Sequence, residues 1–381
     1  MKPDIYNKIN TERLIDTMIE LIKIDSESGD EKAVADHLKS LFTSLGATCE
    51  LQILPDKVKT NSGNLFVRFA GTKAECDPLL FSCHMDTVQP GKNIVPIRHD
   101  DRITSDGTTI LGADDKAGIA ALIETIRLIQ ENDLPCCDIE ILLTVCEETG
   151  LLGARYADLD KVKAKMAFVL DSSDPPGSFV VNGVAQDKIN VVVTGKEAHA
   201  GVAPEEGVSA LVIAAKALAN MKLLRVSKQT TANFSRIEGG GATNIVTGRV
   251  ELFGEARSLD EAELNAQVAH MRACFEEAAA SERGQVEFTA ERMYAGFQVN
   301  PTSDILALGQ AACHKAGLPY KELSSGGGSD TNVYNARGLP AVTLGIGEQK
   351  PHSRDEFVLI KDLEDTVKLV LGLIDSQQKK G

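Results

Sequence analysis

Four short apolar runs, each followed by a polar side chain, limit most strongly what this chain can fold into. The runs and the residues that follow them are 78–83 with His84, 139–146 with Glu147 and Glu148, 166–170 with Asp171, and 340–346 with His352 after a short loop. Near-continuous apolar runs of this length are typical of strands that are buried on both faces of a sheet. Residues 115–132, between the first two runs, have apolar side chains at helical spacing, so a mainly parallel α/β sheet is predicted.

The polar residues that follow these runs are expected to converge in space. In an open α/β sheet, ligands bind beyond the carboxyl ends of the strands, which meet at one edge. The four runs would bring imidazole and carboxylate groups to that edge. Asp114 joins them, because it lies at the start of the predicted helix.

Each of these residues also has an ordinary structural interpretation when it is taken alone. Asp114 could be a helix N-cap. Glu147 and Glu148 could be a charged strand end at the surface, or a metal ligand and a base side by side. His84 and Asp86 could belong to a polar loop, or to a ligand whose second ring nitrogen a carboxylate fixes.

The set as a whole favours a metal site. The predicted ligands are His84, Asp114, Glu148, Asp171 and His352. Two imidazoles and three carboxylates suit Zn²⁺, and Mn²⁺ or Co²⁺ are possible.

Residues 184–298 have a different pattern, which predicts a second domain inserted into the first. Strands are expected over 188–194, 249–255 and 285–290, and helices over 208–221 and 259–281. This order predicts two βα units packed as an α+β sheet. The α/β pattern then resumes with a helix over 303–316 and the run 340–346. The predicted domains are therefore 1–183 with 299–381, and 184–298.

The composition excludes several classes of partner. The formal net charge of −15 argues against nucleic acid and anionic membranes as main partners. No apolar stretch approaches the 18 or more residues that a membrane helix needs. The eight cysteines contain no CxxC pair, and we expect all eight to be reduced thiols in a cytoplasmic protein, since the polar N-terminus has no signal-peptide core.

Five sequence motifs resemble the motif series of one enzyme family. SCHMDTV, GADDKAG, CEETG, VLDSS and the late PHS occur in family order between residues 82 and 353. They are similar to the motifs of the dinuclear-zinc metallopeptidases that include peptidase T, glutamate carboxypeptidase and aminoacylase, and the overall pattern looks most like peptidase T and its relatives. The resemblance implies a zinc-binding α/β domain and an inserted ferredoxin-like lid that often mediates dimers.

The resemblance also implies roles for the residues around the metals. Asp114 would bridge two metal ions, His84 and Asp171 would complete one site, and Glu148 and His352 the other. Glu147 would be the general base and Asp86 would orient His84. The peptide bond between Asp114 and Asp115 is cis in many such enzymes.

Further candidates come from the insert and from a glycine-rich loop. His199 in GKEAHAG resembles a histidine that reaches the scissile carbonyl oxygen, often from the partner subunit. Asn244 and Arg257 resemble residues that hold polar groups or the carboxylate of the substrate, and Gly327 and Gly328 belong to a loop that resembles the lining of the substrate cleft. Taken alone, these residues would be a surface histidine, a turn asparagine, a strand-end arginine and a flexible loop.

Hydrolysis of peptide bonds in short peptides, of the aminopeptidase or tripeptidase type, is the predicted function. A carboxypeptidase or an N-acyl amino acid deacylase on the same metal centre is the alternative, and a non-catalytic scaffold is a remote one. The expected cofactors are two divalent metal ions, and a homodimer could form through the insert.

Overall fold

The computed structural model describes residues 3–73 and 76–377, which divide into two compact units. The first unit contains the chain up to Val181, residues 298–324 and the chain from residue 329 onward. The second unit contains Asn182–Phe297 and the short loop Ser325–Gly328. None of the helices in the described residues is both long enough and apolar enough to cross a lipid bilayer.

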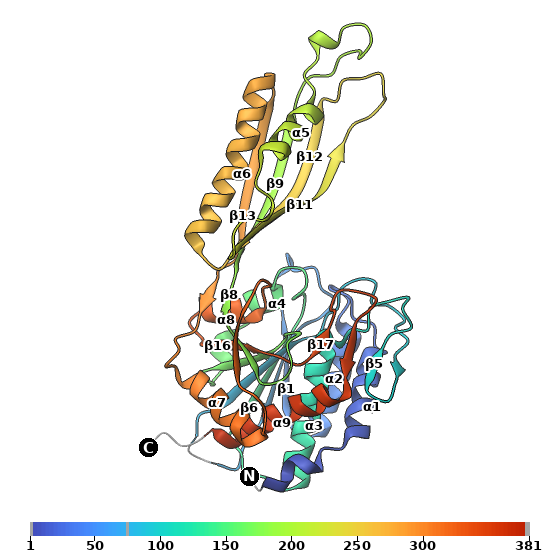
Figure 1. The fold of residues 1–381 in the computed structure, drawn as a ribbon. Helices are drawn as coiled ribbons and strands as arrows, with labels where there is room; N and C mark the ends of the chain where they lie inside the picture. The colour runs from blue at the N-terminus through green and yellow to red at the C-terminus, as the bar shows by residue number, and fades with distance from the viewer. Residues whose placement is uncertain (1–2, 74–75, 378–381) are drawn as a thin grey trace. The chain divides into compact units, whose positions relative to one another are not determined.

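The first unit is built around a mixed central sheet (Figure 1). Its strands are β1 (Thr48–Ile53), β2 (Gly63–Phe69), β3 (Leu79–His84), β6 (Ile139–Thr144), β7 (Ala167–Leu170), β8 (Ser178–Gly183), β14 (Phe297–Gln298), β15 (Lys321–Ser325) and β16 (Ala341–Leu344). The strand order is β1-β2-β6-β3-β7-β16-β8-β14, and β15 pairs with β8. A small sheet is formed by β17 (Glu348–Gln349), β18 (Phe357–Leu359), β5 (Arg102–Thr104) and β4 (Ile97–Arg98).

The four middle strands of the central sheet are the four apolar runs of the sequence. The pairs β6–β3, β3–β7 and β7–β16 are parallel, while β1, β2 and β8 pair antiparallel toward the two edges. Every residue of β3, β6, β7 and β16 is buried, as expected for strands that are covered on both faces. The predicted parallel arrangement is confirmed, and it places the carboxyl ends of the four strands along one edge.

Helices pack around the central sheet, and those predicted over 115–132 and 303–316 are among them. They are α1 (Thr11–Ile22), α2 (Lys32–Ser44), α3 (Ala113–Glu131), α4 (Leu152–Arg155), α7 (Asp304–Ala316), α8 (Asp330–Ala336) and α9 (Ile360–Ser376), with short 3-10 turns at Pro3–Lys8 and Leu159–Lys161. Helices α1, α3, α9 and α7 pack against one another in that order, while α8 contacts β7 and β16. Gly46 follows α2 with a φ of +83°, a left-handed conformation that commonly ends a helix.

The second unit is a five-stranded antiparallel sheet with two helices. Its elements are β9 (Ala185–Thr194), α5 (Ala210–Asn220), β10 (Leu224–Arg225), β11 (Thr230–Gly239), β12 (Arg249–Ser258), α6 (Glu261–Glu282) and β13 (Gln285–Tyr294), with a 3-10 turn at Pro204–Glu206. The strand order β10-β11-β12-β9-β13 contains the β-α-β-β-α-β pattern of a ferredoxin-like fold. Strand β11 is not predicted from the sequence, because only Thr230 and Ala232 are buried and the strand lacks an apolar face of useful length.

The loop Ser325–Gly328 packs with the second unit, whereas the predicted domain boundaries place it in the first. A side chain at Gly328 would meet the ring of Tyr294 at 2.2 Å, so only a glycine allows this close packing. Nη1 of Arg257 donates a hydrogen bond to the carbonyl oxygen of Gly326 at 3.3 Å. Both contacts hold the glycine-rich loop against the ends of β12 and β13.

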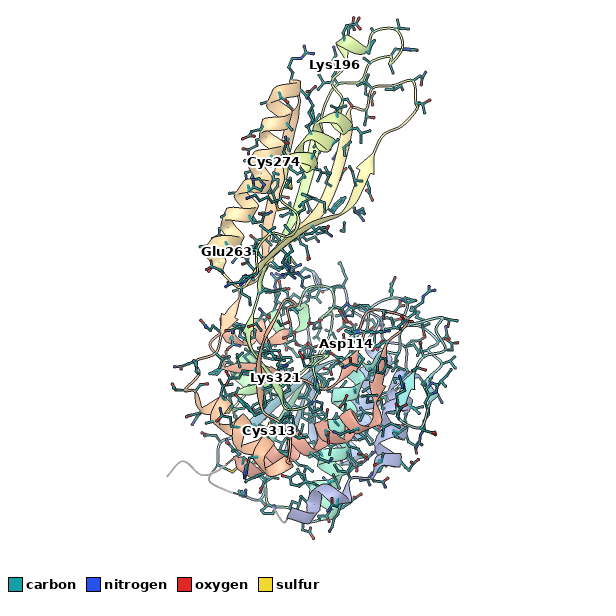
Figure 2. All side chains as sticks on the ribbon, in the orientation of Figure 1. Asp114, Lys196, Glu263, Cys274, Cys313 and Lys321 are labelled. Atoms are coloured by element: carbon teal, nitrogen blue, oxygen red, sulfur yellow. A yellow bond between two sulfur atoms is a disulfide. The ribbon has the colours of Figure 1, made fainter. Side chains whose placement is uncertain are left out.

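The expectation that all eight cysteines are reduced is wrong for one pair. Cys76 and Cys137, 61 residues apart, form a disulfide with a Cα–Cα distance of 5.6 Å. The backbone N–H groups of Thr72 and Lys73 both donate to the carbonyl oxygen of Cys136, which brings the two loops together. The other six are free thiols; Cys274 on α6 and Cys313 on α7 (Figure 2) are examples buried in the two units.

Candidate metal centre

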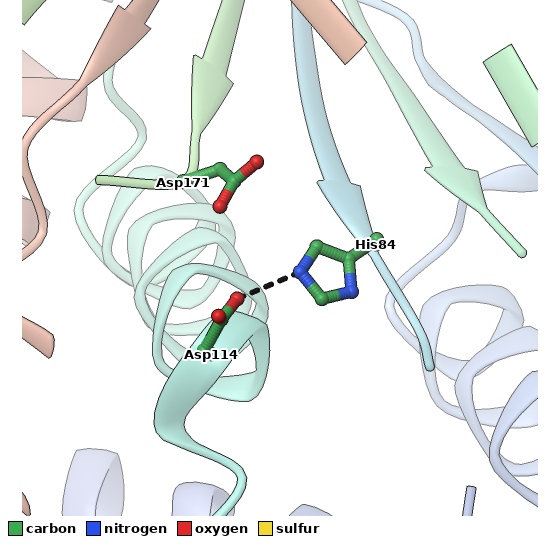
Figure 3. A group of neighbouring side chains, drawn as sticks. All are labelled: His84, Asp114 and Asp171. Carbon is green, nitrogen blue, oxygen red and sulfur yellow. Dashed lines mark hydrogen bonds and ion pairs between the residues drawn. The ribbon is translucent and has the colours of Figure 1, made fainter. Parts of the chain in front are cut away.

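His84 and Asp114 form the centre of the polar cluster at the carboxyl edge of the sheet. His84 ends β3 and is 2% exposed. Its Nδ1 lies 2.8 Å from the backbone carbonyl oxygen of Asp86, and its Nε2 lies 2.7 Å from Oδ1 of Asp114. Since a carbonyl can only accept, Nδ1 donates to it, and in the metal-free protein Nε2 donates to the carboxylate of Asp114. Loss of the Nε2 proton would keep Nδ1–H on the carbonyl and free Nε2 for a metal ion, which is the usual arrangement of a metal-binding histidine. Figure 3 shows Asp171 beside the same two side chains.

Asp114 is shared between two groups of potential ligands. Its Oδ1 faces His84, while its Oδ2 lies 3.2 Å from Nε2 of His352, which in turn lies 2.9 Å from Oε1 of Glu148. In three groups the candidate ligand atoms all lie within 4.8 Å of one another: His84 with Asp114 and Asp171, His84 with Glu147 and Glu148, and Asp114 with Glu148 and His352. Imidazole nitrogens and carboxylate oxygens at these separations fit divalent cations such as Zn²⁺, Mn²⁺ or Co²⁺.

The peptide bond between Asp114 and Asp115 is cis, as the family resemblance implied. Both residues have non-helical backbone angles although they lie in the first turn of α3. The carboxylate of Asp115 is engaged with the backbone, since its Oδ2 accepts the N–H of His84 at 3.1 Å. Asp115 therefore links the start of α3 to the end of β3, and Asp114 is left free to face the imidazoles.

The crowding of carboxylates shifts the pKa values of the cluster. Burial, followed by the charge of Asp171, raises the pKa of Glu147 well above its usual range. Burial, followed by the charge of Asp114, does the same to the pKa of Asp171. Hydrogen bonds to Asp114 and Glu148 raise the pKa of His352 to about 10. Excess negative charge in a buried site is stabilised by cations, and protons fill this role when no metal ion is bound.

The carboxylate of Asp86 organises the loop that carries the two glutamates. It lies 3.6 Å from Nδ1 of His84, which is hydrogen-bonded to the backbone carbonyl of Asp86 instead. Its Oδ1 accepts the N–H of Glu147 at 2.9 Å, and its Oδ2 accepts the N–H of Glu148 at 3.2 Å. The hydroxyl of Ser28 donates to Oδ2 at 2.6 Å. Asp86 thus fixes both glutamates through their backbone, a role that the HxD spacing did not predict.

Two residues that hold the site had no signal in the sequence. Ser28 lies in the polar break between α1 and α2, where its hydroxyl reaches Asp86. Glu356 lies in the polar stretch after His352 and accepts backbone N–H groups from the loop that carries Asp114. Neither position belongs to an apolar run, so periodicity could not identify it.

The candidates in the second unit fall into two separate places. His199 and Asn244 are exposed and lie on neighbouring segments, since the N–H of Ala200 donates to the carbonyl oxygen of Asn244 at 2.8 Å. Arg257 lies near the glycine-rich loop and pairs with Glu255 through Nε and Nη2, at 2.9 and 3.1 Å.

These two places lie toward opposite ends of the insert's sheet. In the β9–β12 ladder, Thr194 pairs with Arg249 at the end from which the His199 segment continues, while Gln186 pairs with Arg257 at the other end. The eight intervening steps along β9 span about 26 Å at the usual strand rise. His199 and Arg257 of one chain therefore do not meet.

The family comparison agrees with this geometry. Residues 80–376 match the model of peptidase family M20/M25/M40. Peptidase T from Vibrio cholerae serotype O1 is 31% identical over 277 residues, which cover 72% of this chain and 67% of that protein.

Two solved structures are similar over nearly the whole chain. Aminopeptidase PepT from Bacillus cereus ATCC 10987 is 42% identical with a TM-score of 0.87, and the match covers 97% of this chain and 99% of that one. A tripeptidase from Staphylococcus aureus subsp. aureus Mu50 is 40% identical with a TM-score of 0.92, covering 97% and 100%. The chain belongs to peptidase family M20/M25/M40, and within it to the peptidase T-like metallopeptidases.

Proposed function

We propose that this chain hydrolyses short peptides from their amino ends, with two divalent metal ions, zinc foremost, held around Asp114. The observation that carries the proposal is the position of Asp114 between two histidine–carboxylate groups, with Glu147 beside them. The two similar structures are an aminopeptidase and a tripeptidase, which supports the choice of substrate.

Five side chains would hold the metal ions. His84 and Asp171 would bind one ion, Glu148 and His352 the other, and Asp114 would bridge both. Bound there, the ions would lower the pKa of a water molecule and polarise the scissile carbonyl.

Glu147 would act as the general base. Its carboxylate would take the proton of the attacking water and pass it to the leaving amine. Asp86 would keep Glu147 in place through the backbone.

Residues of the insert would contact the substrate from two sides. Three contacts occupy Nε, Nη1 and Nη2 of Arg257, which leaves two of its five N–H donors for a substrate carboxylate. Gly327 and Gly328 would form the wall beside it. His199 would donate a hydrogen bond to the scissile carbonyl oxygen as negative charge develops there, which typically raises the rate by a factor of about 10²–10³. Asn244 would bind a neighbouring polar group of the substrate.

A homodimer through the insert would make both sets of contacts possible. Since His199 and Arg257 of one chain lie at opposite ends of the same sheet, we propose that His199 acts in the site of the partner chain. Leu211 and Val212 on α5 are exposed apolar side chains, 51% and 43% accessible, which favours a protein partner on this helix. Residues 233–239 of β11 lie beyond the short pairing with β10 and offer a free strand edge within the described part of the chain.

A substrate panel tests the proposal. Metal-loaded protein should release amino acids from unblocked tripeptides, and more slowly from dipeptides. Peptides with an acetylated amino end, N-acyl amino acids and peptides with a carboxyl-terminal glutamate should be poor substrates. Faster turnover of N-acyl amino acids would identify a deacylase, faster release of a carboxyl-terminal residue would identify a carboxypeptidase, and either result would overturn the aminopeptidase assignment.

A further inference from the structure

One buried carboxylate holds the loop that presents Asp114. Glu356 is 1% exposed. Its Oε2 accepts the backbone N–H groups of Leu111 and Gly112, both at 2.8 Å, and its Oε1 accepts the N–H of Asp114 at 3.1 Å. Three backbone donors are thus satisfied by one side chain that lies more than 240 residues away in the sequence.

This loop has no acceptor of its own for those donors. Gly112 is the N-cap of α3 and has no side chain with which to cap it, and its φ of +74° is left-handed. Of the three donors, the N–H of Asp114 belongs to the first turn of α3, where N–H groups have no partner within the helix and need one from elsewhere. A carboxylate suits this position, because it also interacts favourably with the positive end of the helix dipole.

Glu356 and His352 hold Asp114 from the same short segment. Nε2 of His352 lies 3.2 Å from Oδ2 of Asp114, while Oε1 of Glu356 accepts the N–H of the same residue. The N–H of Glu356 donates to the carbonyl oxygen of Ser353 at 3.2 Å, which closes the turn between the two side chains. The segment 352–356 therefore fixes both the carboxylate and the backbone of Asp114.

We propose that Glu356 is a positioning residue of the metal centre, which sets the orientation of Asp114 so that each carboxylate oxygen faces one group of ligands. The inference rests on the proposed function in one respect, namely that the cluster around Asp114 binds metal ions. It predicts that Glu356 controls metal affinity without touching a metal ion.

Glu356→Gln is the direct test. The glutamine oxygen can still accept from Leu111 and Gly112, but its amide NH₂ then faces the N–H of Asp114, and two donors repel. The metal-free protein is titrated with Zn²⁺, and with Mn²⁺ in parallel, by calorimetry. The variant should bind about 10–100-fold more weakly, the usual loss when a residue behind a metal ligand is changed. The visible absorption of the Co²⁺-loaded protein should change as well.

Glu140 offers a matched control. It is also a buried carboxylate, 4% exposed, and its Oε2 accepts the backbone N–H groups of Lys163 and Ala164 at 2.8 and 2.9 Å. It lies near the start of β6, whereas the cluster follows the end of that strand. Glu140→Gln should reduce thermal stability to a similar extent and leave the Zn²⁺ isotherm and the Co²⁺ spectrum unchanged.

The outcomes separate this inference from the proposed function. Wild-type protein that binds no divalent ion would overturn both. Wild-type binding with an unchanged isotherm in Glu356→Gln, or an equal loss of affinity in Glu140→Gln, would overturn the positioning role alone. If Glu356→Gln does not fold, Glu356→Asp decides, because it keeps the charge but shortens the reach by one methylene; affinity equal to wild type would then refute the role.

Discussion

Oδ1 of Asp86 accepts the backbone N–H of Glu147 at 2.9 Å. The carboxylate two residues after His84 therefore holds the backbone of the proposed base. The same carboxylate accepts the N–H of Glu148. Two strand ends, those of β3 and β6, are joined here by one buried side chain. The spacing of the glutamates relative to His84 therefore depends on Asp86.

Asp86→Asn is expected to lower kcat about 10–100-fold while the protein remains folded. An asparagine has one acceptor oxygen, so either Glu147 or Glu148 would face an amide NH₂ in place of a carboxylate oxygen. Ser28→Ala is the matched control, because it removes a hydroxyl donor to Asp86 and leaves both backbone contacts in place. Steady-state kinetics on a tripeptide measure both; equal losses in the two variants would contradict the role given to Asp86.

Glu147→Gln should reduce kcat by about 10²–10⁴, the range for a positioned general base. Its metal content should remain that of the wild type, because Glu147 is not one of the five proposed ligands. Glu148→Gln should behave in the opposite way and lose metal affinity, since Oε1 of Glu148 lies 2.9 Å from His352 in the second ligand group. Metal analysis by mass spectrometry together with turnover numbers separates the two residues. Full turnover in Glu147→Gln would remove it as the base.

Metal binding should release protons near neutral pH. In the metal-free protein the pKa of His352 is about 10, so its imidazole is protonated at pH 7 and must lose its proton to bind a metal ion. The pKa values of Glu147 and Asp171 are also raised, so the metal-free cluster holds further protons on these carboxyl groups. Metal affinity should therefore rise with pH up to about 10. Calorimetry at pH 7 in buffers of different ionisation enthalpy measures the number released, and a value of zero would contradict these protonation states.

The convergence of the predicted ligands could be inferred from the sequence because parallel strands end at one edge. His84, Glu148 and Asp171 each follow a fully buried run, and burial on both faces leaves few alternatives for such a run. Asp114 at the start of α3 and His352 after β16 follow from the same topology. The ferredoxin-like insert was predicted in outline, although β11 was missed because most of its side chains are exposed.

The supporting contacts could not be predicted, because they depend on where separate loops meet. Glu356 finds its three N–H donors across more than 240 residues, and nothing in the polar stretch around it marks the position. The pairing of Cys76 with Cys137 depends on backbone hydrogen bonds between two loops. Contacts of this kind follow from packing of the whole unit, whereas periodicity reports only on single elements.

The disulfide between Cys76 and Cys137 should stabilise the first unit. A disulfide typically raises the free energy of unfolding by about 2–4 kcal/mol, because it lowers the conformational entropy of the unfolded chain. Cys76→Ser should lower the melting temperature under non-reducing conditions, and a reducing agent should remove most of the difference from wild type. Cys49→Ser, which changes a half-buried free thiol, is the control. Alkylation before and after reduction counts the thiols, and eight reactive thiols in the unfolded, unreduced chain would show that the disulfide does not form.

The separation of His199 from Arg257 predicts complementation between two inactive variants. His199→Ala and Glu147→Gln should each have low activity as homodimers. In a mixed dimer, the His199→Ala chain still has Glu147 and would receive His199 from its partner, so one of the two sites is complete. Equal mixing after subunit exchange should restore roughly a quarter of wild-type activity, since half of the dimers are mixed and each has one working site. Activity that stays at the sum of the two homodimers, with subunit exchange verified by mass spectrometry, would place His199 in the site of its own chain or outside the reaction.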